Sequence, residues 1–160
     1  MTKYHMNRKD REITDKEEIS RLLRNGKYAV IAMCRNNEPY IVTLSYGYDE
    51  QTNALYFHSA MKGLKLDFIK ENPYVCATII EDKGYINNEC EHHYSSLVIW
   101  GKMTIVEAIE EKKDAMEILL NHLESNPGPI RERNFKNEKV FNNFTMLKLE
   151  ISELTAKQGH

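Results

Sequence analysis

The sequence has little of what marks a disulfide-bonded or membrane-spanning protein. It contains three cysteines, Cys34, Cys76 and Cys90, and no C-x-x-C pair. This odd, widely spaced set argues against a disulfide framework and fits a reducing compartment. The sequence also lacks a long apolar run, and its first residues lack the apolar core of a signal peptide. We therefore expect a cytoplasmic protein that neither spans nor binds a membrane.

An excess of charge of one sign is also absent. The chain has 22 basic and 24 acidic residues, which gives a formal net charge of -2. A dedicated nucleic-acid surface usually brings a basic excess, so we expect partners that are small molecules or protein chains rather than nucleic acids. Nothing resembles a Ser-His-Asp set or a pair of catalytic carboxylates, and the sequence therefore assigns no catalytic residue.

The length is that of one domain, residues 1–160. A chain of 160 residues can bury about two-thirds of its unfolded surface in a single core. Residues 1–13 are polar and charged and would form an N-terminal arm. The sequence leaves open whether this arm lies along the fold or is flexible.

Helices are predicted from capping signals and from the spacing of apolar residues. Thr14-Asp15-Lys16-Glu17 has the S/T-x-x-E spacing of a capping box, which predicts a first helix that ends at Gly26. The apolar residues after Gly63 predict a second helix, and Ala108 to Leu123 predicts a third with one apolar stripe. Residues 130–143 are charged with scattered aromatic residues, which indicates a short helical excursion.

Six strands are predicted between and after these helices. Glu81 to Tyr94 is polar and is predicted to be irregular, and Gly101 would mark a bulge or a close approach of two backbones. The pattern is neither a parallel α/β alternation nor an evenly spaced sandwich, so it predicts a mostly β fold, a small antiparallel β-barrel with peripheral helices. The predicted strands are Tyr28–Cys34, Pro39–Tyr48, Leu55–Phe57, Val75–Ile80, Ser95–Val106 and Phe144–Leu154.

The stretch from Leu55 to Asn72 joins a predicted strand to a predicted helix through a turn suited to an anion. His58 and Ser59 follow the strand, and Lys62 and Lys65 lead into the helix. The helix N-terminus, a hydroxyl and two ammonium groups would together hold a phosphate monoester. Spacing alone also fits two solvated lysines at the start of a surface helix and a histidine at a strand end.

This stretch resembles a known signature. The run Tyr56-Phe57-His58-Ser59-Ala60, followed by Gly63, Lys65 and Asn72-Pro73, is similar to that of flavin-binding split-barrel proteins related to pyridoxamine 5′-phosphate oxidase. It is closest to the branch that includes the nitroimidazole-resistance (Nim-type) proteins. The resemblance extends from the first helix to Lys157. It implies a six-stranded antiparallel split barrel of the FMN-binding type, and a homodimer with the cofactor at the two-fold interface.

The resemblance also implies which residues hold the cofactor, FMN. The second strand would line the isoalloxazine ring, and the turn after the third strand would take the phosphate. A second chain would contribute residues between Glu89 and Trp100. Without the resemblance, Thr43 would be an ordinary β-branched strand residue and Trp100 a core or interface aromatic. The expected cofactor-binding residues are Val42, Thr43, Leu44, Ser45, His58, Ser59, Lys62 and Lys65, with Ser95 and Trp100 as candidates from the partner chain.

The function implied by the resemblance is electron transfer from a reduced nicotinamide donor, NAD(P)H, to a small organic acceptor such as a nitroimidazole-like compound. Pyridoxamine phosphate oxidation is not expected, because the tail from Lys157 to His160 lacks an Arg/His substrate motif. The alternative is a haem-binding or non-catalytic flavin-binding protein, in which His58 or His92 would be an axial haem ligand. The run Cys90-Glu91-His92-His93 lacks a second, spaced ligand pair, so no metal site is predicted.

Overall fold

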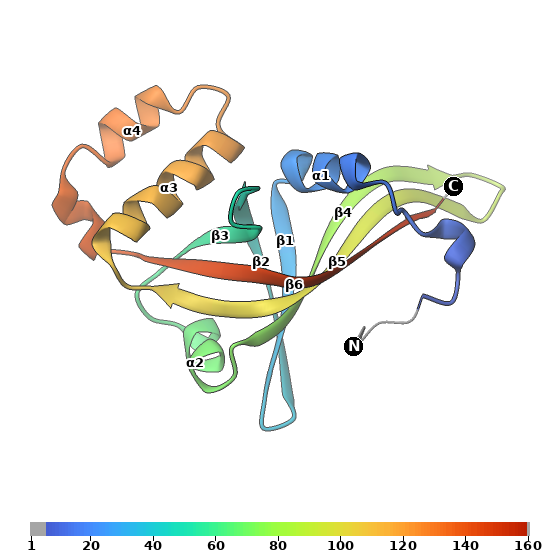
Figure 1. Ribbon diagram of the computed structural model, residues 1–160, viewed down its shortest axis with the longest axis horizontal. Helices are drawn as coiled ribbons and strands as arrows, with labels where there is room; N and C mark the ends of the chain where they lie inside the picture. The colour runs from blue at the N-terminus through green and yellow to red at the C-terminus, as the bar shows by residue number, and fades with distance from the viewer. Residues whose placement is uncertain (1–5, 160) are drawn as a thin grey trace.

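The computed structural model describes residues 6–159, which form a closed antiparallel barrel with helices packed outside it (Figure 1). Going round the barrel, the strand order is β1-β2-β3-β6-β5-β4. The predicted fold class is confirmed. The strands are β1 (Tyr28–Arg35), β2 (Glu38–Asp49), β3 (Ala54–Ser59), β4 (Tyr74–Ile86), β5 (Glu91–Val106) and β6 (Thr145–Gly159). The helices are α1 (Lys16–Asn25), α2 (Leu64–Glu71), α3 (Ile109–Leu123) and α4 (Gly128–Asn134), with 3-10 turns η1 (Lys9–Arg11) and η2 (Glu138–Asn142).

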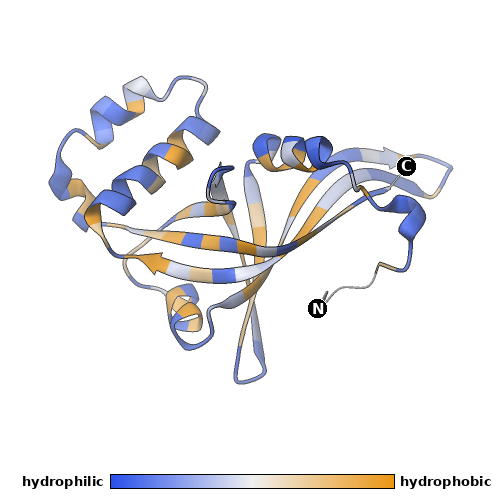
Figure 2. Cartoon of the chain, in the orientation of Figure 1, coloured by the Kyte–Doolittle hydropathy of each residue, from blue (hydrophilic) through white to orange (hydrophobic). Residues whose placement is uncertain are grey.

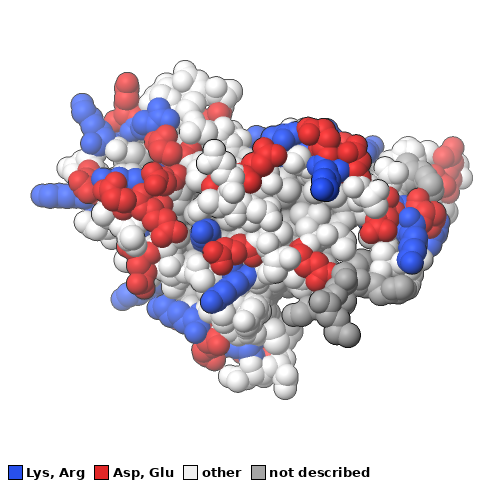
Figure 3. All heavy atoms as spheres, in the orientation of Figure 1, with Lys and Arg blue, Asp and Glu red and all other residues white. Residues whose placement is uncertain are grey.

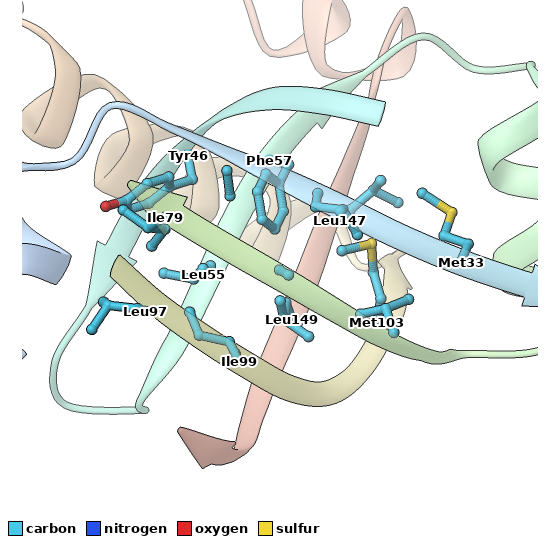
Figure 4. Packing of buried hydrophobic residues seen from close by; sticks show 14 of the residues in the cluster. Met33, Tyr46, Leu55, Phe57, Ile79, Leu97, Ile99, Met103, Leu147 and Leu149 are labelled. Carbon is cyan, nitrogen blue, oxygen red and sulfur yellow. The ribbon is translucent and has the colours of Figure 1, made fainter. Parts of the chain in front are cut away.

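The barrel interior is filled by alternate residues of all six strands (Figure 4). Ile31, Phe57, Ile99 and Leu149 are fully buried there. Burying one such side chain contributes about 1.5–3 kcal/mol to folding, so this layer supplies most of the stability of the barrel. No helix in the described part of the chain is long and apolar enough to cross a membrane.

Helix α1 begins one residue later than the capping box predicted. The N-cap is Asp15, whose carboxylate accepts the backbone N–H of Glu17 over 3.1 Å. The predicted cap at Thr14 was wrong, because the carboxylate of Asp15 already satisfies a helix-end donor and carries the negative charge favoured there. The predicted stop at Gly26 is confirmed, and its reason is packing: a Cβ at Gly26 would overlap the Tyr46 hydroxyl.

Residues 81–94 are not irregular, as the sequence had predicted, but continue β4 and β5 into a hairpin. The pairing runs from Glu81 opposite Ser95 to Ile86 opposite Glu91, with a register shift between Asp82 and Gly84. This hairpin extends beyond the barrel beside the end of β6 (Figure 1). Its residues are mostly exposed, so its polar composition reflects solvent contact on both faces and not a loop.

The described part of the N-terminal arm lies along the barrel. Met6 is buried, and the backbone N–H of Ile13 donates to the Ala156 carbonyl of β6 over 2.9 Å. The prediction for residues 1–5 lies outside the described residues.

Gly101 is both a bulge and a close backbone approach, so this prediction is confirmed. The register between β5 and β6 shifts between Trp100 and Gly101. A Cβ at Gly101 would overlap the Glu150 carbonyl oxygen and lie 2.9 Å from Leu149 Cδ1. Only glycine lets β6 lie this close.

Helix α3 packs on the outside of β2, β3 and β6, with its apolar side toward the sheet (Figure 2). Gly47 of β2 permits this contact, since a Cβ there would lie 2.6 Å from Leu119 Cα. The helical excursion predicted for residues 130–143 is confirmed, as α4 and η2. The buried ammonium of Lys112 holds this segment to α3 by donating to the Phe141 and Phe144 carbonyls over 2.8 and 2.9 Å.

Candidate functional site

The candidate site begins with the outer surface of β2. Thr43 and Ser45 are exposed on that surface, whereas Val42 and Leu44 are half-buried and pack against the barrel core. This follows from the two-residue period of a strand. The two outward side chains can therefore meet a ligand outside the barrel, and the two inward ones can contribute only backbone atoms.

One edge of β2 is open over the same residues. β2 pairs with β1 from Glu38 to Ser45, but with β3 only from Tyr46 to Asp49. Among the described residues, no strand pairs with residues 38–45 on the edge of β2 that faces β3. Alternate N–H and C=O groups of this stretch point toward that edge, and they form a row of donors and acceptors for a ligand.

A hollow of about 370 Å³ adjoins this outer surface of β2. One wall is the strand side, formed by Thr43, Leu44, Ser45 and His58. Sequence reasoning missed the opposite wall, because the apolar stripe of α3 predicts only that the helix packs, and not where. That wall comprises Met116, Leu119, Leu120 and Leu123 of α3, with Ile130 of α4 and Phe135.

His58 lies on the strand wall of the hollow and points outward from β3. Its ring packs against the Phe144 ring, with the centroids 4.9 Å apart, while the side chain remains open to the hollow. Burial lowers the pKa of His58, and the charge of Lys65 lowers it further. The imidazole is therefore neutral at pH 7 and can donate one hydrogen bond and accept another.

The turn from β3 to α2 lies next to His58. Gly63 has φ of 151°, a conformation that favours glycine, and the N-terminus of α2 has no side-chain cap. Lys62 is exposed and Lys65 is half-buried, with Lys65 close enough to His58 to affect its titration. The first turn of the helix thus offers backbone donors beside two ammonium groups.

Ser59 does not share the outward face of His58. It is the last residue of β3, is buried, and its hydroxyl donates to the Ala60 carbonyl over 3.2 Å. Sequence reasoning also missed Thr145, which is paired with Ser59 and whose hydroxyl contacts Met61 Sδ over 3.3 Å. These contacts hold the turn in place.

Ser95 and Trp100 lie away from this hollow in the same chain. Ser95 is fully buried and accepts a hydrogen bond from Lys83 Nζ over 2.9 Å. Trp100 is half-buried and lines a second hollow, of about 470 Å³, with Tyr74 and Cys76. Within one protomer the structure therefore brings Thr43 and Ser45 to one hollow with His58, and Lys65 close to His58, but it places Ser95 and Trp100 elsewhere.

The outer face of β1, β2, β4 and β5 is apolar and exposed. The strand register places Ile41, Ala32, Cys76 and Trp100 in one row across the four strands. Tyr28, Ile41, Tyr74 and Ile80 are exposed on these strands by 48% or more. An apolar patch of this extent usually marks an interface. On the face drawn in Figure 3, by contrast, both signs of charge are interspersed.

The run from Cys90 to His93 lies at the start of β5. His92 Nε2 lies 2.7 Å from Asp82 Oδ1, and His93 Nε2 lies 3.6 Å from Glu91 Oε2. Within residues 6–159 no group of three or more His, Cys, Asp or Glu side chains is placed to hold a metal ion.

The chemistry of the site fits a flavin phosphate. An isoalloxazine needs a flat surface with backbone donors and acceptors, which the open edge of β2 offers at residues 38–45. A terminal phosphate needs positive charge nearby, which Lys62, Lys65 and the start of α2 supply.

Comparison with known proteins gives a family match over most of the chain. The family model described as pyridoxamine 5′-phosphate oxidase matches residues 15–158. An uncharacterized protein, RA0666, from Rhizobium meliloti (strain 1021) is 32% identical over 90 residues, which are 56% of this chain and 54% of that protein. The chain therefore spans about half the length of this relative.

Three solved structures share the fold. A candidate 5-nitroimidazole antibiotic resistance protein from Bacteroides thetaiotaomicron VPI-5482 is 24% identical, with 92% of this chain and 86% of that one covered and a TM-score of 0.77. The FAD and heme binding protein from Mycobacterium smegmatis is 18% identical, with 94% and 74% covered and a TM-score of 0.77. The flavocytochrome Anf3 from Azotobacter vinelandii is 15% identical, with 97% and 72% covered and a TM-score of 0.81.

Proposed function

Because the chain belongs to the pyridoxamine 5′-phosphate oxidase family, we propose that it is a homodimeric FMN-binding oxidoreductase that reduces small organic acceptors. The electron donor in this proposal is a reduced nicotinamide, and nitroimidazole-like compounds are one candidate class of acceptor. Bound FMN would supply the redox chemistry, namely two-electron transfer from donor to acceptor.

The observation that carries the proposal is the position of two features at one hollow and of a third in the turn that follows β3. The open backbone edge of β2 and the outward face of His58 share the hollow, and the β3–α2 turn follows His58, with Lys65 close to that imidazole. The first and the last of these features match the two ends of FMN, because the ring needs a flat polar edge and the phosphate needs cations.

Each group has a part in this proposal. Backbone groups of Val42 and Leu44 and the side chains of Thr43 and Ser45 orient the ring. Lys65 and Lys62 neutralise the phosphate as point charges. The apolar wall of α3 excludes water from the side of the hollow that faces away from β2.

The homodimer is supported by the exposed apolar face of the barrel. Thr43 belongs to a row with Val30, Thr78 and Val98, directly beside the row of Ile41 and Trp100. The outer surface of β2 is therefore continuous with the apolar face. A second copy on that face would cover the outer side of a flavin on β2, and its Ser95–Trp100 segment would be the nearest source of further contacts.

An absorption spectrum of the purified protein tests the proposal. We expect a yellow protein with flavin bands, from which heat denaturation releases FMN identified by chromatography. A Soret band without flavin bands would instead favour the haem-binding alternative, with His58 or His92 as the candidate axial ligand, since each lines a hollow.

A further inference from the structure

A third hollow, of about 250 Å³, lies where the N-terminal arm meets the β4–β5 hairpin (Figure 1). Among the described residues, it shares none with the hollow on β2 that the proposed function gives to FMN. Its volume is below the range typical of sites for cofactors and drug-sized ligands, so it suits a small molecule. The lining residues are Arg11 of η1, Cys90, and Glu91, His92 and Tyr94 at the start of β5.

Arg11 is held in position at this hollow by backbone contacts on both sides. Its backbone N–H donates to the Arg8 carbonyl over 3.0 Å, which closes the 3-10 turn η1. The next residue, Glu12, forms a β-bridge with Lys157 of β6. The side chain of Arg11 therefore reaches the hollow from a backbone that is fixed against the barrel.

Three other arginines show how guanidinium groups are used in this protein. Each donates from Nε and Nη2 to the two oxygens of one carboxylate, over 2.7–2.9 Å. This pair of parallel hydrogen bonds is the geometry in which a guanidinium binds a carboxylate best. The pairs are Arg8 with Asp10, Arg21 with Glu18, and Arg131 with Glu117.

The same edge of the Arg11 guanidinium is not filled. Its Nε is buried, and within residues 6–159 it has no hydrogen-bond partner. A buried donor on a charged group is costly when it is unpaired, because it has lost water without gaining an acceptor. Such a donor beside a hollow indicates that a ligand supplies the acceptor.

The acidic side chains nearest to Arg11 in sequence or across the hairpin already have other partners. An acid from outside the chain would complete the pair of hydrogen bonds at Arg11 without breaking any of these contacts. The contacts are Asp10 with Arg8, Asp82 with His92 and Glu91 with His93.

The remaining wall of the hollow offers flat surfaces for the body of such an acid. His92 and Tyr94 lie two residues apart on β5, so they point to the same side of the strand. A Cβ at Gly159 would lie 2.5 Å from Tyr94 Cε1, which shows that the Tyr94 ring lies directly on the end of β6. The His92 ring is held by its contact with Asp82.

The charges around the hollow favour a single negative charge on the ligand. Of the described residues that line it, Arg11 alone is Lys or Arg, and Glu91 adds a carboxylate. A phosphate dianion would meet one cation and one anion here, whereas a carboxylate needs only the two donors of Arg11.

We propose that Arg11 and this hollow form a binding site for a small monocarboxylic acid. The carboxylate accepts hydrogen bonds from Nε and one Nη of Arg11, and the body of the acid lies against the rings of His92 and Tyr94. The bound acid thereby joins the N-terminal arm to the β4–β5 hairpin. This site does not depend on the proposed flavin function.

The test compares two acids with their neutral amides. The pairs are acetate with acetamide and benzoate with benzamide. Equilibrium dialysis against the purified protein at pH 7.5 should show at least one acid binding about tenfold or more tightly than its amide, because only the acid gains charge-assisted hydrogen bonds. A preference for the acid in neither pair would overturn the proposal, and so would inorganic phosphate that binds more tightly than both acids.

Substitution of Arg11 locates the binding. Arg11→Gln should remove the preference for the acid, and Arg11→Lys should weaken acid binding because an ammonium group cannot form the paired hydrogen bonds. Arg11→Lys keeps the charge and also serves if Arg11→Gln fails to fold. Arg8→Gln is the matched control, since that guanidinium is exposed and already bound to Asp10. Acid preference that persists in folded Arg11→Gln, wild-type acid affinity in Arg11→Lys, or an equal loss in Arg8→Gln would overturn the proposal.

FMN affinity, measured in parallel, separates this site from the flavin site. Arg11→Gln should bind FMN as the wild type does. Loss of FMN affinity in the folded variant, equal to the loss for the acid, would mean that Arg11 serves the flavin and would overturn the proposal. Acid binding that depends on Arg11 in a protein that binds no FMN would support this site and reject the flavin function.

Discussion

The imidazole of His122 accepts the backbone N–H of Tyr48 on its Nδ1, over 3.3 Å, and so joins helix α3 to strand β2. Because Nδ1 accepts, the proton is on Nε2, which donates to the Gly26 carbonyl over 2.6 Å. One neutral side chain thus connects α3, β2 and the end of α1. It holds the helix that forms the apolar wall of the hollow.

This arrangement predicts a loss of stability in acid. Burial is the main cause that lowers the pKa of His122 in the folded protein. Near pH 7 both states are neutral, but as the pH falls below about 6.5 the unfolded chain takes up a proton that the folded chain resists. We expect the free energy of unfolding to fall from pH 7 to pH 5.5, with a further contribution of the same sign from His58.

Urea unfolding of His122→Ala at both pH values checks this prediction. The variant should lose about 1–3 kcal/mol at pH 7, because the Tyr48 N–H loses its acceptor. It should also lose less stability than the wild type between pH 7 and pH 5.5. His93→Ala, on the projecting hairpin, is the control. A wild-type pH dependence in His122→Ala would show that this imidazole does not cause the acid sensitivity.

Gly101→Ala should destabilise the barrel by about 1–3 kcal/mol, because the added methyl group meets the Glu150 carbonyl across the β5–β6 bulge. Gly128→Ala is the control, since its nearest contact is a side-chain oxygen of Asn126 at 3.3 Å. Chemical denaturation of the two variants measures the difference. Equal stabilities would mean that β6 does not lie as close to Gly101 as described.

Lys65→Ala should weaken FMN binding by about 1.5–3 kcal/mol, the range for a hydrogen bond to a charged group. This corresponds to a roughly ten- to one-hundred-and-fifty-fold rise in the dissociation constant. Lys70→Ala, an exposed lysine in the last turn of the same helix, should have little effect. Fluorescence titration of the apo-protein measures both, and equal affinities in the two variants would remove Lys65 from the phosphate site.

Sedimentation at micromolar concentration should show a stable homodimer. Ile41→Glu should yield monomers, because this side chain is 62% exposed in the protomer and would bring a carboxylate into an apolar interface. Lys136→Glu, exposed beyond α4, is the control for added negative charge. A monomeric wild type, or a dimer that persists in Ile41→Glu, would contradict the proposed interface.

The sequence predicted the barrel better than it predicted the site. Alternation in β2 and β6 and the break at Asn72-Pro73 are local signals, and they sufficed to locate strands along the chain but not to give their order round the barrel. The wall formed by Leu120 and Phe135 was missed, because docking of a helix on a barrel depends on contacts between distant residues. The orientation of Ser59 was missed because β3 continues two residues beyond its apolar run, which turns that hydroxyl away from His58.

The most direct measurement of the central claim is a competitive fluorescence titration of apo-protein with FMN, FAD and riboflavin. We predict that FMN binds most tightly, FAD less tightly and riboflavin most weakly. The reason is that two lysines and a helix N-terminus would lie beside one terminal phosphate dianion. FAD keeps only a singly charged inner phosphate, and riboflavin keeps none. FMN affinity should also fall as salt rises, because part of the attraction is Coulombic. Riboflavin binding as tightly as FMN would contradict the account, because the β3–α2 turn would then not be a phosphate site.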